Sequence, residues 1–435
     1  MDASKMTGGP IPTLIELDLT KPAAGQKSLM NRWHNDIPFV ASVKPGSIFK
    51  VDCLEWTGGQ VKNNDNADDL RDIDLTSVHQ LTGPIEVQGA EPGDMIEVIF
   101  HDVAFHPDAP WGFSGIFERE NGGGLFAGPE DFKEYHAAKA IWDLTGVYAT
   151  SRHIPGVRLA GVPHPGLVGT LPSAELLAKW NERECGLIEA CKVNGVEKVP
   201  AVALPPNKQG AYVGQDLPEA VREKIYREGA RTIPGREHGG NCDIKNLSRG
   251  SKAYLPVFQS GAGLAIGDLH FSQGDGELAF CGAIEMAGTV TMEINILKNG
   301  VELLGNGTMP IYLPSPVDPM YSDKIVFQGL GVDMHGDGRQ MNMCATTAYK
   351  EAAKNCIKFL QVLGYTREQA ILLLTAAPVE SHVAAIVDSP NACVTMELPK
   401  AIFDRDLTIT AKGFEKRDYG QAAVRSDAKA GMYTK

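Results

Sequence analysis

The chain has 435 residues, of which 43% are hydrophobic and 22% are charged, and its formal net charge is −13. This length exceeds one ordinary core, the composition is typical of globular proteins, and the negative charge argues against a nucleic-acid partner. No apolar run approaches the roughly 20 residues that span a bilayer, and the N-terminus shows no secretory signal. The eight cysteines are scattered without a CxxC pair, a pattern that predicts reduced thiols and a cytoplasmic location.

The first third of the chain is predicted to be rich in β-strands. Apolar and polar residues alternate over residues 13–19, 49–56 and 94–105, which is the period of a half-buried strand. Residues 63–75, between the second and third of these strands, form a crowded acidic loop. The loop lacks the ligand spacing of an EF-hand, so we expect it to be solvated or to support a nearby site.

Helical patterns appear later, over residues 172–184, 217–230 and 342–364. Gly364 ends the longest of these helices, and Thr366 followed by Gln369 fits a capping box that begins another helix. Two consecutive helices with a short joint predict a helical hairpin packed against a sheet.

Residues 252–297 return to strand patterns, and residues 411–435 are polar and predict an extended tail. The fold class is therefore α+β with β-structure dominant and helices gathered in the C-terminal third. We expect a β-rich N-terminal part (residues 1–170), an α+β part that carries the polar site (171–410) and the tail (411–435).

The stretch REHGGNCD, residues 236–243, is the first of three segments that could carry chemistry. His238 is followed by two glycines, which let the backbone turn sharply and approach a ligand. Asn241 and Asp243 are two residues apart and would point the same way on an extended strand. The alternative is a loop whose Asn and Asp side chains cap their own backbone.

The second segment is GDLHFSQGDGE, residues 267–277. Asp268 and His270 would share one face of a strand, and carboxylate oxygen and imidazole nitrogen both bind divalent metals. Asp275 and Gly276 predict a hairpin turn, after which Glu277 restarts the chain in the opposite direction. The alternative is a polar strand edge that ends in an ordinary hairpin.

Glu285 stands inside the apolar stretch FCGAIEMAG, the third segment. Burying a carboxylate there is costly without a compensating cation, and burial raises the pKa of a carboxyl group. A raised pKa suits a general base for water, so Glu285 is the best single candidate for acid/base work. The alternative is a salt bridge to an Arg or Lys.

Neighbouring strands would bring His238, Asp243, Asp268, His270 and Glu285 into one pocket, the arrangement of a hydrolytic metal site. His335, in GVDMHGDG, is predicted to belong to a separate turn. His79, a lone histidine before a turn, more often caps a backbone than binds a metal.

With these residues identified, the chain resembles the acetamidase/formamidase family. The resemblance rests on HGGNCDIKNLSRGSKAYLPV, GDLHFSQGDGELAFCGAIEMAG, TGPIEVQGAEPGD and PWGFSGIF, and it extends into the helical stretch after Asn342. It implies a hydrolase of small aliphatic amides, with formamide cleaved to formate and ammonia, on a β-rich fold. It also implies a divalent metal and a homo-oligomer, for which we expect a trimer or a multiple of one.

Applied to this sequence, the resemblance places His238, Asn241 and Asp243 in the first family motif, and Asp268, His270, Glu277 and Glu285 in the second. We expect Asp268 and His270, with His238 or Asp243, to hold the metal, with zinc as the expected ion. Glu285, Asn241 and Glu277 are the expected catalytic residues, with Glu285 as base and Asn241, or the backbone beside it, as oxyanion donor. Trp111 and Phe113 are candidates for a wall that excludes a methyl group, the alternative being that both are core aromatics.

Three other functions stay open at this stage. The polar cluster could be a structural Ca²⁺ or Mg²⁺ site, because its ligands are rich in oxygen. The protein could be a thiol-dependent amidase that uses Cys242 or Cys281. A redox enzyme would need a bound nicotinamide or flavin. For the amide hydrolase itself, acetamide or another small amide could be the substrate in place of formamide.

Overall fold

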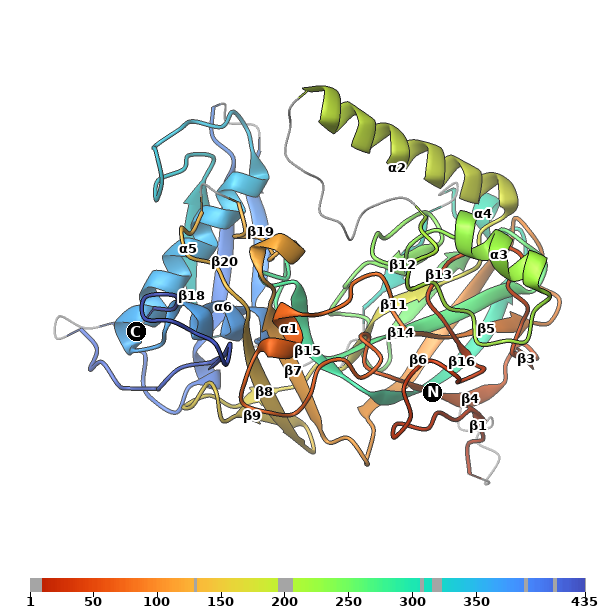
Figure 1. Ribbon diagram of the computed structural model, residues 1–435, viewed down its shortest axis with the longest axis horizontal. Helices are drawn as coiled ribbons and strands as arrows, with labels where there is room; N and C mark the ends of the chain where they lie inside the picture. Colours follow the sequence, from red (N-terminus) through yellow and green to blue (C-terminus); the bar gives the residue numbers. More distant parts are fainter. Residues whose placement is uncertain are drawn as a thin grey trace.

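The computed structural model describes residues 10–128, 131–194, 206–305, 309–314, 323–386, 390–409 and 413–434. Three β-sheets make up most of it, with helices α2 and α3 at one end and α5 and α6 at the other (Figure 1). The predicted α+β class with dominant β-structure is confirmed. In the part of the chain so described, no helix is both long and apolar enough to cross a membrane.

The first sheet has six strands and combines early with middle parts of the chain. Its order is β1 (Thr13–Ile15), β4 (Ile48–Cys53), β16 (Gly288–Leu297), β6 (Met95–Phe105), β13 (Lys252–Pro256) and β17 (Ile311–Leu313). Neighbouring strands are antiparallel except for β1 and β4, which are parallel. The strands predicted at 13–19, 49–56 and 94–105 are therefore present, although the first is shorter than predicted.

The second sheet has twelve strands and carries the candidate site. Its main path is β10 (Leu159–Ala160), β9 (Tyr148–Ser151), β8 (Ala138–Thr145), β7 (Trp111–Ile116), β15 (Cys281–Met286), β14 (Ala262–Gln273), β11 (His164–Gly169) and β12 (Gly239–Asn241). Four further strands lie off this path: β2 (Leu29–Met30), β3 (Ala41–Val43), β5 (Leu81–Val87) and β21 (Ala423–Val424). Strand β5 pairs with β2, β3 and β14, and β21 pairs with β8.

Strand β14 is buried along its whole length. It pairs with β5, β11 and β15 in its own sheet, and its contacts with β4 and β6 join it to the six-stranded sheet. Polar side chains on such a strand are removed from water, so they need partners within the protein. Asp268 and His270, which lie on β14, are therefore removed from water and must be paired by other groups of the protein.

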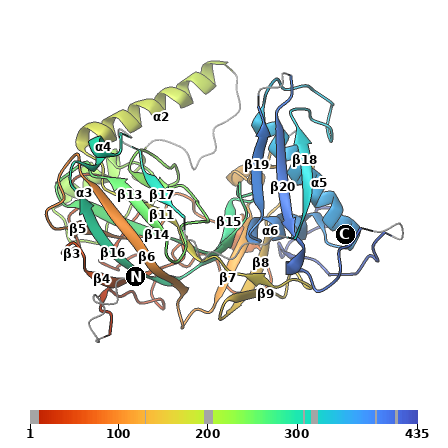
Figure 2. The same cartoon turned by 180° about the vertical axis from the view of Figure 1, so that it is seen from behind.

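The third sheet contains β18 (Lys324–Leu330), β20 (Cys393–Pro399) and β19 (Glu380–Ala385), in that order. Helix α5 (Ala345–Leu363) packs on this sheet, while α6 (Arg367–Ala376) contacts strands β7, β8, β14 and β15 of the twelve-stranded sheet. Seen from behind, the third sheet and α5 stand at the opposite end from the six-stranded sheet (Figure 2).

The joint between α5 and α6 follows the sequence prediction. Gly364 has φ 119° in the left-handed region and ends α5, and Thr366 and Gln369 form the reciprocal hydrogen bonds of a capping box at α6. The other helical segments are α1 (Asp68–Arg71), α2 (Ala174–Asn194), α3 (Glu219–Glu228) and α4 (Gly300–Leu303), with 3-10 turns η2 (Arg119–Asn121) and η4 (Lys400–Ile402).

The boundary expected at residue 170 separates no sheet, because both large sheets combine strands from either side of it. Over its described residues 413–434 the C-terminal segment contains the short strand β21 and otherwise irregular structure and turns, and it packs on its own chain. Tyr419 stacks on Tyr365, with ring centroids 4.1 Å apart, and β21 adds to the edge of β8.

Candidate active site

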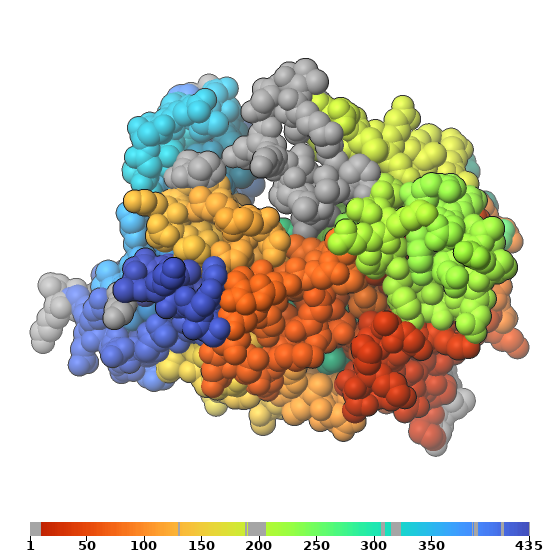
Figure 3. All heavy atoms as spheres, viewed as in Figure 1, coloured from red at the N-terminus to blue at the C-terminus, as the bar shows by residue number. Residues whose placement is uncertain are grey.

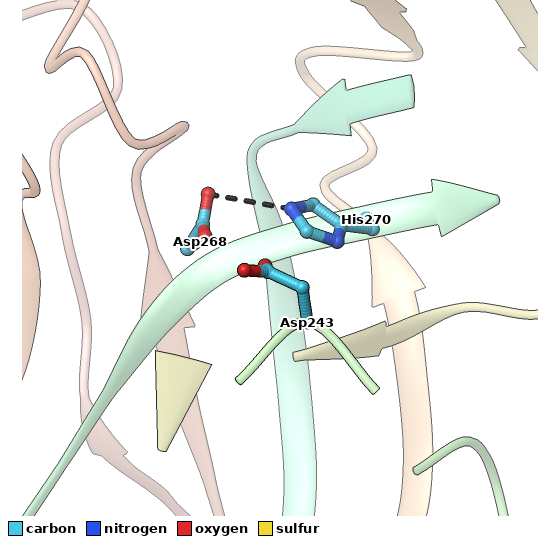
Figure 4. A group of neighbouring side chains, drawn as sticks. All are labelled: Asp243, Asp268 and His270. Carbon is cyan, nitrogen blue, oxygen red and sulfur yellow. Dashed lines mark ion pairs between the residues drawn. The ribbon is translucent and has the colours of Figure 1, made fainter. Parts of the chain in front are cut away.

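Asp243, Asp268 and His270 lie at the centre of the candidate site. Each offers one ligand-type atom, and these atoms lie within 4.8 Å of one another. Figure 4 shows the three side chains converging, with Asp243 on the segment after β12 and the other two on β14. Nε2 of His270 lies 3.4 Å from Oδ1 of Asp268. The structure thus brings together three of the four residues expected to bind a metal.

The backbone around this group is constrained. Asp243 and Asp268 have φ of 50° and 55°, in the left-handed region that residues other than glycine rarely adopt. Gly166, on β11, faces all three side chains: a Cβ there would lie 2.4 Å from Cε1 of His270 and 2.7 Å from Oδ1 of Asp243. Only glycine fits at this position, and strained backbone of this kind is concentrated at functional sites.

Glu285 joins the group from β15. It is 3% exposed, and its Oε2 lies 3.1 Å from Nε2 of His270. Burial raises the pKa of Glu285 to about 8, with His270 opposing this rise. Although burial disfavours the charged imidazole, Glu285 and Asp268 raise the pKa of His270 well above its usual value. The cluster therefore favours a positive charge at its centre.

Gln273 and His164 fix the orientation of the His270 ring. The Gln273 amide nitrogen donates to the backbone carbonyl of Asp243 at 2.7 Å, so its Oε1 accepts and lies 3.0 Å from Nδ1 of His270. Nδ1 of His164 contacts the carbonyl oxygen of Val162. Nε2 of His164 lies 3.2 Å from Nδ1 of His270. This network assigns the proton to Nδ1 of His270 and directs Nε2 toward the carboxylates.

Glu277 lies beside Asp243 in the turn between β14 and β15. It does not restart the return strand as expected, because β15 begins only at Cys281. Burial and the nearby charge of Asp243 raise the pKa of Glu277 well above its usual value. Burial and the charge of Asp268 raise the pKa of Asp243 to about 7. Four carboxyl groups therefore share a small volume, and they repel one another when ionised.

His79 is a site residue that the sequence patterns assigned to a backbone cap. Its Nε2 lies 3.9 Å from Oδ2 of Asp268, and its Nδ1 lies 3.1 Å from the hydroxyl of Thr232. Burial lowers the pKa of His79, although Asp268 opposes this. The contact joins residues almost 200 positions apart in the chain, and a single sequence contains no pattern for such a contact.

A cavity of about 400 Å³ opens beside the group. Its polar lining residues are His79, Asn241, Asp243, Asp268, Glu277 and Glu285. Its larger apolar lining residues are Trp56, Leu75, Val78, Leu125, Ile233 and Phe280. Residues of the segment from about 50 to 80 lie at the centre of the face that Figure 3 shows. Four residues of this segment, Trp56, Leu75, Val78 and His79, line the cavity.

The aromatic wall differs from the one expected. Among the described residues that line the cavity, neither Trp111 nor Phe113 occurs, whereas Trp56 and Phe280 do. Phe113 is 1% exposed and belongs to the same hydrophobic cluster as Trp56, and the half-buried Trp111 packs against this cluster. In the described part of the structure, both residues therefore lie in or against the cluster and do not line the cavity.

His238 does not join the group of ligand atoms. Its ring packs between Trp33 and Trp180, with centroids 4.5 Å away on each side, and the lining of the cavity does not include it. Burial lowers the pKa of His238 well below its usual value. The structure thus places His238 apart from Asp243, Asp268 and His270, with a tryptophan on each side of its ring. His335 pairs with Glu351 at 2.6 Å, away from the site, as its assignment to a separate turn implied.

The donor set fits a divalent cation. Oδ1 of Asp243 is buried without a hydrogen-bond partner in the described part of the protein, and Nε2 of His270 points toward the carboxylates. A ligating histidine whose other nitrogen is held by an acceptor, here Oε1 of Gln273, is the usual arrangement at protein metal sites. A cation would also relieve the repulsion among the four carboxyl groups.

A buried carboxylate and histidine cluster beside an open cavity is typical of hydrolases. The chain belongs to the acetamidase/formamidase family, whose sequence model matches residues 16–405. It is 50% identical to a formamidase of Methylophilus methylotrophus over 402 residues, which are 92% of this chain and 96% of that protein. Over 364 residues, 82% of this chain and 87% of the relative, it is 50% identical to an acetamidase of Mycolicibacterium smegmatis.

Among solved structures, a gamma lactamase from Delftia acidovorans is 48% identical and superposes with a TM-score of 0.89. The alignment covers 95% of this chain and 100% of that one. The family and these relatives identify the chain as an amidohydrolase.

Proposed function

We propose that this amidohydrolase converts formamide and water to formate and ammonia with the help of a divalent cation, expected to be zinc. The observation that carries the proposal is the position of Glu285, a buried carboxylate that lines the same cavity as Asp243 and Asp268. The formamidase and the acetamidase relatives are equally identical to this chain, at 50%, but the alignment with the formamidase covers more of it, 92% against 82%, and this supports formamide as the substrate.

Asp243, Asp268 and His270 would hold the cation. When bound, it would polarise the amide carbonyl and lower the pKa of a water molecule. Glu285 accepts a proton from the attacking water and delivers it to the amide nitrogen as the C–N bond breaks. The side-chain amide of Asn241, which lines the cavity, donates to the carbonyl oxygen as negative charge develops on it. Glu277 holds Asp243 in position.

The thiol alternative has less support in the structure. Neither Cys242 nor Cys281 is among the described residues that line the cavity. Burial raises the pKa of Cys281 well above its usual value, so its reactive thiolate form is disfavoured. The homo-oligomer and the cytoplasmic location expected from the sequence stay predictions.

The test is ammonia release from formamide and acetamide by purified protein, with bound metal measured on the same samples. We expect turnover to track bound metal, and Glu285→Gln to reduce kcat at least 100-fold while it retains the metal. Glu293→Gln, which changes a buried glutamate on β16 outside the site, is the matched control and should keep its activity. Full turnover in metal-free protein would refute the role of the cation, and full turnover in Glu285→Gln would refute the role of the base.

A further inference from the structure

The cavity is much larger than the substrate of the proposed function requires. It measures about 400 Å³, whereas formamide has only three non-hydrogen atoms. A water molecule takes up about 30 Å³ in the liquid. Pockets of about 300–1,000 Å³ hold ligands of the size of drugs. Most of the cavity is therefore available to a group that formamide lacks.

The apolar part of the lining forms one continuous patch. Trp56, Leu75 and Val78 belong to a single hydrophobic cluster, and Ile233 and Phe280 pack against it. We call these five residues the apolar wall. Three of them come from residues 56–78, and the other two come from the segments before β12 and β15. A wall of this composition gains free energy from contact with hydrocarbon and gains none from contact with an amide group.

Ring contacts hold the apolar wall in place without a ligand. Phe280 stacks on Phe117 with centroids 5.1 Å apart, and Trp56 lies 6.2 Å from the same ring. Trp56 also lies 5.1 Å from His79, which connects the wall to the polar group. Ile233 and Phe280 are half-buried, so the cavity reaches the surface beside them. A preformed apolar surface binds a ligand without the cost of ordering it.

We propose that the apolar wall binds the acyl group of the substrate, and that the enzyme hydrolyses primary amides whose acyl group is a branched or cyclic hydrocarbon. This inference rests on the proposed function, because the same polar group cleaves the C–N bond. The products are the corresponding carboxylate and ammonium, with water supplying the oxygen. Each methylene that becomes buried in the transition state raises kcat/KM about fourfold.

The test compares formamide, acetamide, isobutyramide and cyclohexanecarboxamide as substrates of the cation-loaded protein. We expect kcat/KM for isobutyramide to exceed that for acetamide by roughly 15-fold, the value for two additional buried carbons. In Ile233→Phe, which fills part of the cavity beside the wall, the ratio of kcat/KM for isobutyramide over formamide should fall at least tenfold. Ile296→Phe, the same change at a half-buried residue of β16, should leave the ratio unchanged.

The outcomes separate this proposal from the one on which it rests. Formamide turnover with isobutyramide slower than acetamide would overturn the role of the apolar wall and leave the proposed function intact. The absence of turnover with every amide would overturn both. If Ile233→Phe does not fold, the wild-type series decides alone, together with the thermal shift that cyclohexanecarboxamide produces: a shift no larger than that of formamide contradicts the proposal.

Discussion

Gly166 shows how a residue without a side chain can decide the chemistry of a site. Its substitution by alanine would place a Cβ within 2.8 Å of Asp268 as well as against Asp243 and His270. We expect Gly166→Ala to weaken cation binding at least tenfold, because all three groups must move apart. Binding measured by calorimetry checks this. Gly186→Ala, on α2 with no atom near the new Cβ, is the control and should bind the cation normally.

The residues of the site differ in how far the sequence could predict them. Asp268 and His270 lie two apart on one strand, so the period of the strand is enough to place them together. His238 matched the same kind of motif, but only the tertiary structure shows that two tryptophans enclose it. His79 and His164 reach the site through contacts between distant segments, and periodicity carries no information about such contacts.

Parts of one helix also differ in how far the sequence could predict them. The pattern at 172–184 predicted the start of α2 correctly, because Leu177 and Trp180 face the core there. The helix nevertheless continues to Asn194, and Cys185, Gly186 and Leu187 are exposed. An amphipathic pattern marks only the packed part of a helix, so a continuation through the exposed residues 185–187 could not be predicted.

A buried lysine is one of the residues that link the acidic loop before β5 to the twelve-stranded sheet. Nζ of Lys139, a side chain with no exposed surface, lies 2.7 Å from Oδ2 of Asp69 and also donates to Lys62 and Asn64. Lys139→Met would leave the Asp69 carboxylate without its cation, and we expect a loss of about 3–5 kcal/mol in the free energy of unfolding. Urea denaturation measures the loss.

Lys179 supplies the comparison for that experiment. It pairs with Glu175 at 2.8 Å, but both side chains are more than half exposed, at 66% and 79%. Lys179→Met should change the free energy of unfolding by less than about 0.5 kcal/mol. An equal effect of the two substitutions would show that Lys139 does not hold the loop in the way described.

Two buried histidines, His34 and His153, should each contribute less to the stability of the protein in mild acid. His34 and His153 are buried, and the Nδ1 atom of each accepts a backbone N–H, from Asp36 and Ile141 respectively. Burial lowers the pKa of both histidines below 6.5. Below pH 6.5 the unfolded chain therefore binds protons that the folded protein does not, so the contribution of these two histidines to stability decreases as the pH falls through this value.

Urea unfolding of the wild type and of the double variant His34→Asn/His153→Asn between pH 7.5 and 5.5 isolates this contribution. In the variant the asparagine oxygens can accept the same N–H groups without titrating, so the stability of the wild type relative to the variant should decrease as the pH falls. A double variant that depends on pH as steeply as the wild type would assign the effect to other groups.

The order of the six-stranded sheet also has a consequence for the synthesis of the protein. Strand β6 ends at Phe105, and among the described strands its neighbours in that sheet are β13 and β16, which begin at Lys252 and Gly288. At about 5–20 residues per second, the ribosome needs roughly ten seconds or more to produce the first of these partners. During that time both edges of an apolar strand lack partners, and such edges promote aggregation. A nascent chain of this topology therefore depends on chaperones, or on rapid completion of synthesis, to reach its native fold.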